Sequence, residues 1–95
     1  VSQNNFTLPS AATLGHVSKL SIVEDKPIML DYWKASLTKD VIIGVRDNEE
    51  KLLVKSEDEY TSPIAKIFGS GKEYIIVTEN SIYIVSSDID NKRIS

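Results

Sequence analysis

Short apolar runs separated by polar turns recur along residues 17–88 of this 95-residue chain. Isoleucine and valine crowd these runs, and β-branched residues favour strands. No segment keeps apolar residues at positions i, i+3, i+4 and i+7 over three turns, the pattern of an amphipathic helix. The pattern therefore predicts an all-β fold, a small single-domain sandwich or barrel of about seven short antiparallel strands.

Polar turns separate the predicted strands. Residues 41–46, VIIGVR, and 51–55, KLLVK, flank the turn 47–50, which predicts a hairpin. Residues 34–40, KASLTKD, are too short for a stable isolated helix, so we expect a helical turn or a loop there. A mixed α+β fold requires a helix in that segment or near the N-terminus. The other predicted strands are residues 17–23, 28–33, 64–68 and 72–78 and the run after Asn80.

The stretch FGSGKEYIIVTENSIYIVSS, residues 68–87, predicts the most detailed structure. Gly69 and Gly71 fit a three-residue hairpin loop that joins 64–68 to 72–78, because glycine tolerates positive φ. A two-residue turn at Glu79-Asn80 then gives a second hairpin with two apolar faces. One face carries Ile75, Val77, Ile82 and Ile84, and the other carries Tyr74, Ile76, Tyr83 and Val85.

A hairpin that is apolar on both faces must be covered on both. Either this chain's own segments or a second subunit supplies the second cover. If a second subunit does so, Tyr74 and Tyr83 lie at the contact with hydroxyls available for hydrogen bonds.

The two ends of the chain lack these patterns. Residues 1–15, VSQNNFTLPSAATLG, carry no charged side chain and no apolar period, which predicts a flexible N-terminal arm before an all-β domain of residues 16–88. The arm is either a frayed terminus or a segment that lies along a neighbouring subunit through Phe6 and Leu8. Residues 89–95 are polar and predict a C-terminal tail that frays.

Composition narrows the classes of partner. With 41% hydrophobic and 26% charged residues, the chain has the composition of a globular domain. The net charge of −3 and the scattered lysines and arginines argue against binding to duplex nucleic acid. The absence of cysteine excludes disulfides and thiolate chemistry. Apolar runs of three or four residues are too short to span a membrane.

Candidate chemistry is sparse. Gly69-Ser70-Gly71-Lys72 has the letters of a phosphate-binding loop, but Lys66 stands where its first glycine belongs and Glu73 where its hydroxyl belongs. His16 is the only histidine, so it cannot build a multi-histidine metal site. As a general base it would also need a carboxylate and a nucleophile. The acidic stretch 47–59 lacks the ligand spacing of a calcium loop. We therefore expect that the chain is not an enzyme and that it binds neither a cofactor nor a metal ion.

One aromatic pair is flanked by charge in DYWK, residues 31–34. On a strand, Tyr32 and Trp33 point to opposite faces, so one is expected in the core and the other exposed or at an interface.

We expect a non-enzymatic domain that works by contact with a protein partner or by self-association, as a structural or accessory subunit. By analogy alone, this arrangement suits subunits of viruses and phages. The alternative is a binding module for a small ligand or for single-stranded nucleic acid. The expected contact residues are Phe6, Leu8, Trp33, Tyr74 and Tyr83.

Overall fold

The computed structural model describes residues 8–94, which form two four-stranded sheets and two helices. Strands make up 40% and helices 22% of these residues, so the fold is predominantly β. Sheet 1 has the order β1 (Ile28–Met29), β7 (Ile82–Ser86), β6 (Glu73–Thr78) and β5 (Ile64–Ser70). Sheet 2 has the order β4 (Glu59–Tyr60), β3 (Lys51–Ser56), β2 (Ile42–Val45) and β8 (Asn91–Arg93). The helices are α1 (Ala11–Glu24) and α2 (Trp33–Leu37).

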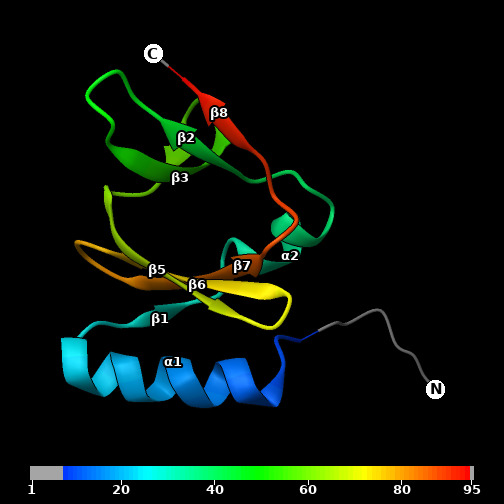
Figure 1. The fold of residues 1–95 in the computed structure, drawn as a ribbon, viewed down its shortest axis with the longest axis vertical. Coiled ribbons are helices and arrows are strands. Elements are labelled where there is room, and N and C mark those ends of the chain that lie inside the picture. Colours follow the sequence, from blue (N-terminus) through cyan, green and yellow to red (C-terminus); the bar gives the residue numbers. More distant parts are fainter. Residues whose placement is uncertain (1–7, 95) are drawn as a thin grey trace.

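The elements stack in three layers, with sheet 1 in the middle (Figure 1). Helix α1 covers one face of sheet 1, and sheet 2 lies beyond the other face. Each interface has its own apolar core. The first core contains Val17, Trp33, Ile75, Val77, Ile82 and Ile84. The second, between the sheets, contains Tyr32, Val41, Ile43, Leu53, Ile76, Val85 and Ile89.

The β6–β7 hairpin is confirmed residue by residue. The structure pairs Tyr74 with Val85 and Val77 with Ile82, in the register that a Glu79-Asn80 turn predicts. Its two faces belong to the two different cores, so both are buried. The second cover is therefore supplied by this chain itself, through α1 on one side and sheet 2 on the other.

The two other predicted hairpins form with small differences. β2 and β3 pair around the polar turn, with Val45 opposite Lys51. β5 and β6 are joined by a two-residue turn and not by three residues, because Ser70 already pairs with Glu73. Gly71 takes the positive φ of 61°, as glycine does at the first central position of a type II′ turn, whereas Gly69 lies within β5.

Helix α1 corrects the predictions for residues 11–15 and 17–23, which form one helix and not an arm followed by a strand. Ser10 caps this helix, because its side chain accepts a hydrogen bond from Thr13 N at 3.2 Å. The buried positions Thr13 and Val17 are four residues apart, as one helical face requires. This stripe of buried residues ends early, since Ile22 is 82% exposed. The sequence therefore lacks the apolar repeat over three turns that predicts an amphipathic helix.

The segment after α1 also departs from the predicted strand 28–33. Only β1 is extended, and it pairs with β7 in parallel. The helical turn expected within 34–40 is present as α2. Ser36 anchors it: its buried Oγ accepts a hydrogen bond from Ser86 N at 2.9 Å and donates one to Trp33 O at 2.6 Å.

The predicted tail 89–95 is ordered over most of its length. Ile89 is buried between the sheets, and β8 pairs with β2 in parallel. Both sheets are thus mixed rather than antiparallel. The fold is thus predominantly β with two added helices, and its open sheets do not close into a barrel. Within the described part of the chain, neither helix has the length and apolar character needed to cross a membrane.

Candidate functional site

The structure places four of the five predicted contact residues, and it places them at different sites. Trp33 is buried against α1 and sheet 1. Tyr74 and Tyr83 are half-buried and pack on the core between the sheets. Leu8 is 67% exposed, and Phe6 lies outside the described residues. Trp33, Tyr74 and Tyr83 therefore support the fold from within and do not form a common outer surface.

Tyr32 and Trp33 do point to different sides, but neither is exposed. Tyr32 enters the core between the sheets, where its ring meets the Tyr83 ring edge-on with centroids 5.3 Å apart. Burial, with the nearby Glu59 carboxylate second, raises the pKa of Tyr32 to about 12. Burial also raises the pKa of Tyr83, against an opposing hydrogen bond with Ser81. Both phenols are thus neutral near pH 7 and serve packing.

The glycine-lysine turn leads directly to a structural carboxylate. Ser10 Oγ donates a hydrogen bond to Glu73 Oε1 at 3.0 Å, and Thr13 Oγ1 donates to the same oxygen. Burial tends to raise the pKa of Glu73, but these hydrogen bonds outweigh it and the pKa is lowered. Glu73 therefore places its negative charge at the N-terminus of α1, where an anion is stabilised. The adjoining residues build a helix cap and not a phosphate loop.

A hollow lies on the outer face of sheet 2, away from sheet 1. Leu53 points into the core between the sheets, so its neighbours Leu52 and Val54 point outward. Together with residues of β2, β4 and the C-terminal end they line a groove of about 440 Å³. The lining residues are Arg46, Leu52, Val54, Ser56, Glu57, Tyr60 and Ile94.

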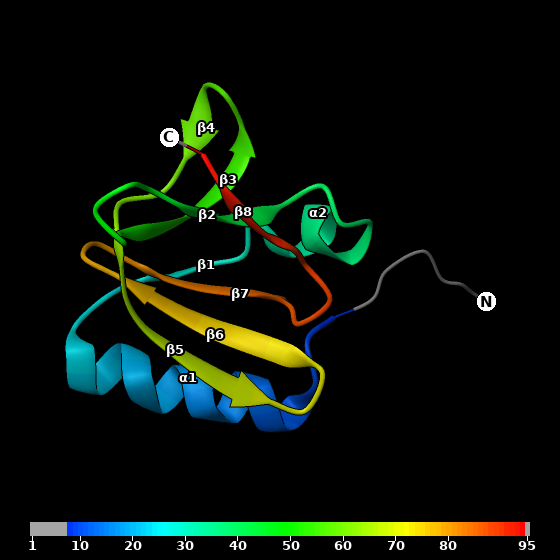
Figure 2. The same ribbon diagram turned by 45° about the horizontal axis from the view of Figure 1, so that its top comes forward.

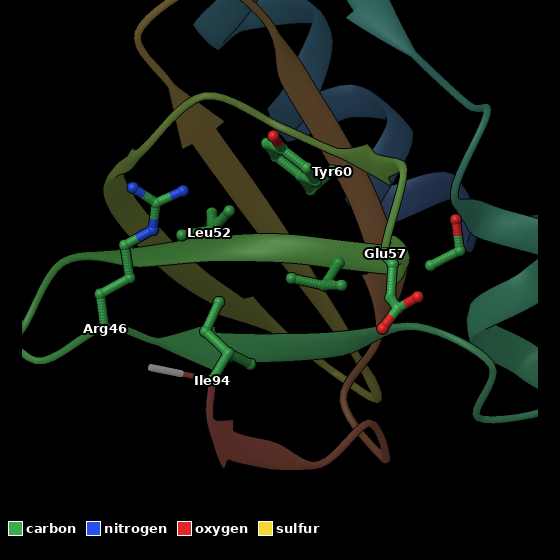
Figure 3. A pocket seen from close by; sticks show the side chains of 7 residues that line it. Arg46, Leu52, Glu57, Tyr60 and Ile94 are labelled. Carbon is green, nitrogen blue, oxygen red and sulfur yellow. The ribbon is translucent and has the colours of Figure 1, made fainter.

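The groove has an apolar centre and charged ends (Figure 3). Arg46 lies at one end and Glu57 at the other, while Tyr60 and Ile94 flank the centre from opposite sides. Leu52 is buried below this rim, whereas Tyr60 is 54% exposed. The Arg46 guanidinium is 3.7 Å from the Glu50 carboxylate, a solvent-exposed ion pair that a ligand can replace at little cost.

Gly44 explains how Ile94 can lie so close to this face. It pairs with Leu52 across β2 and β3 and carries no side chain into the groove. A Cβ atom at this position would lie 2.7 Å from Ile94 Cδ1 and 3.0 Å from Val54 Cγ2. The glycine therefore lets Ile94 lie against sheet 2 and form one side of the groove.

A smaller hollow of about 340 Å³ lies beside α1, lined by His16, Lys19, Leu20, Phe68, Gly69 and Ile75. His16 is thus placed at an apolar opening. Within residues 8–94, no group of three or more His, Asp or Glu side chains is arranged to hold a metal ion.

Sequence reasoning missed the groove, although a signal was present. Residues 41–43, VII, and 52–54, LLV, are apolar at consecutive positions, so the β2–β3 hairpin has an apolar outer face as well as an apolar inner one. The β2–β3 segment thus shares with β6–β7 the pattern of a hairpin that is apolar on both faces. Tyr60 and Ile94 come from distant parts of the chain, and only the fold brings them to this face.

No family model, no curated protein and no solved structure matches this chain. The candidate site is therefore judged by its own geometry.

Proposed function

We propose that this chain is a non-enzymatic contact module that binds an apolar segment of a protein partner in the groove of sheet 2. The observation that carries the proposal is an open apolar hollow, about 440 Å³, between charges of opposite sign. Protein contacts combine such a desolvated apolar centre with a polar rim. The two facing sheets then form an open sandwich, and the outer face of sheet 2 is available to the partner.

The lining predicts the chemistry of the bound segment. An apolar side chain fits above Leu52, between Tyr60 and Ile94, where it loses its contact with water. An acidic group beside Arg46 and a basic group beside Glu57 complete the fit through charge-assisted hydrogen bonds. The expected partner is thus a peptide segment with an apolar centre between an acidic and a basic end.

The five contact residues predicted from the sequence have different roles in this binding. Leu8, with its exposed side chain, is a secondary contact near the start of α1, and Phe6, outside the described residues, is proposed as a second one from the sequence alone. Trp33, Tyr74 and Tyr83 have a supporting part, because they pack inside the fold. A structural or accessory subunit, including one of a virus or phage, would use such a module to assemble with a larger partner.

A small apolar ligand is the second candidate. Pockets for small molecules typically have volumes of about 300–1,000 Å³, and this groove lies within that range. Tyr60 also presents an exposed ring on which a base could stack, but Glu57 beside it disfavours a nucleic-acid backbone.

Selection of displayed peptides on the immobilised 95-residue chain tests the proposal. We expect enriched peptides with an acidic residue on one side of an apolar centre and a basic residue on the other. The charge-swapped variant Arg46→Glu/Glu57→Arg should lose these peptides and select their charge-reversed counterparts. Isotope-labelled protein should show the largest amide shifts at the groove residues when the peptide is added.

Lys34→Glu is the matched control, since it reverses one exposed charge on α2, away from the groove. It should bind the original peptides as the natural chain does. Enriched peptides without a charge pattern, or amide shifts that map elsewhere, would overturn the peptide-binding proposal. Shifts in the groove with apolar fragments but not with peptides would favour the small-ligand alternative.

A further inference from the structure

Strand β5 presents an open edge of sheet 1. It has seven residues and, in the described part of the chain, pairs with β6 alone. Figure 2 shows it crossing above α1 at the border of the sheet. An edge strand offers a row of backbone N–H and C=O groups to another strand. The chemistry that completes such an edge is therefore another extended backbone.

The other sheet edges are closed by short or charged strands, as natural proteins commonly do. β1 and β4 have two residues each, and β8 has three, including Lys92 and Arg93. β5 is longer and carries one charge, although its pairing with β6 shifts register at a bulge or irregularity between Ile64 and Lys66. It contains no proline, and its single charged residue, Lys66, forms an ion pair of 3.1 Å with Glu24 of α1.

We propose that two copies of this chain pair through antiparallel β5 strands, joining their two copies of sheet 1 into one continuous sheet. A register centred on Ile67 places this residue opposite itself in the second copy. Lys66 then faces Phe68 of the partner subunit, so no like charges meet across the strands. Ile67 is 39% exposed at this edge and would be buried by the pairing.

The position of helix α1 favours a second copy of this chain as the partner that pairs with β5. It runs antiparallel to β5, because Thr13 contacts Ser70 at one end and Glu24 contacts Lys66 at the other. In the two-fold pair, the half of α1 with His16 and Lys19 faces the Glu24 end of the second helix. The positive charge of Lys19 and the negative charge of Glu24 are then complementary across the axis.

The hollow beside α1 also fits this arrangement. It opens next to Phe68, between Leu20 and β5, and its lining is mostly apolar. Val23 lies on the same side of α1 as His16 and Leu20, by helical spacing, and its side chain is exposed. The two-fold pair brings this exposed side chain towards the hollow of the second copy. This inference does not depend on the groove of sheet 2.

Light scattering on the 95-residue chain tests the pairing, with an expected mass of twice the single-chain 10.6 kDa. Ile67→Lys and Ile67→Glu, each alone, place like charges opposite each other and should raise the dimer dissociation constant about tenfold or more. An equimolar mixture of the two variants should restore the doubled mass. Leu37→Lys is the matched control, because Leu37 is 40% exposed on α2, remote from β5.

Disulfide cross-linking is a second measurement of the pairing. It does not use the charged variants, so any loss of their stability does not affect it. The chain has no cysteine, so Ile67→Cys introduces a single thiol. Mild oxidation should give a covalent dimer with this variant and not with Leu37→Cys, since opposed antiparallel residues bring their Cβ atoms within reach.

A natural chain that stays monomeric up to about 1 mM would overturn the pairing. So would dimers that both charged variants leave unchanged. Groove variants that lose peptide but keep the doubled mass separate this inference from the proposed function.

Discussion

Glu73 connects the start of β6 to the start of α1, where its partner Ser10 lies 63 positions earlier in the chain. Its carboxylate accepts hydrogen bonds from Ser10 N, at 3.3 Å, from Ser10 Oγ and from Thr13 Oγ1. All of these donors belong to the start of α1, whereas Glu73 begins β6. The same glutamate that argues against a phosphate loop in the sequence thus has a positive use, which is to fix the helix to sheet 1.

Glu73→Gln should destabilise the fold by about 1 kcal/mol at pH 7, because hydrogen bonds to a partly exposed charged group are worth little more than this. The folded pKa of Glu73 is lowered, so the contribution of its carboxylate is present above the ordinary value of 4.5. It is lost as the pH falls below that value. Urea denaturation at several pH values should show the difference from the natural chain shrinking in acid. A constant difference at all pH values would contradict this assignment.

Helix α1 is the element on which the sequence and the structure disagree most, so it provides a direct test. A strand over 17–23 would place Leu20 and Ile22 on one face, whereas the helix buries Val17 and exposes Ile22. Val17→Ala should cost about 2 kcal/mol in stability, because it leaves a gap in the core under α1. Ile22→Ala should change stability by less than about 0.5 kcal/mol. Thermal unfolding followed by circular dichroism measures both, and a large loss at Ile22 would contradict the helix.

An element could be predicted where the residues that fix its structure lie close together in the sequence. The β6–β7 hairpin could be predicted down to the pairing of Val77 with Ile82, because a two-residue turn fixes the register and both faces are apolar. Helix α1 could not, since its two buried residues, Thr13 and Val17, make a stripe too short for the periodicity test. The groove depends on Gly44, Tyr60 and Ile94, which only the tertiary fold brings together.

At the scale of the whole molecule, stability depends on the contact between the two sheets. Tyr32 and Tyr83 meet edge-on in this interface, and Lys55 of sheet 2 lies with its Nζ 5.7 Å from the centre of the Tyr32 ring. Tyr32 is buried and Tyr83 is half-buried, and both phenols are neutral at pH 7. Ionisation of Tyr32 would place a negative charge between the layers, near Glu59.

We therefore expect the two sheets to separate in alkali. The pKa of Tyr32 rises from 10.0 in the ordinary state to about 12 in the fold, so its contribution to stability is complete below pH 10 and is lost as the pH rises towards 12. Tyr32→Phe keeps the ring but has no proton to lose, so its stability should fall less steeply above pH 10 than that of the natural chain. Tyrosinate absorbance and circular dichroism should change together in the natural chain, because ionisation and unfolding are coupled. Tyr60→Phe, on the exposed rim of the groove, is the matched control and should leave the alkaline transition in place. If Tyr32→Phe unfolds in alkali as the natural chain does, the pH dependence does not arise from the contact between the sheets.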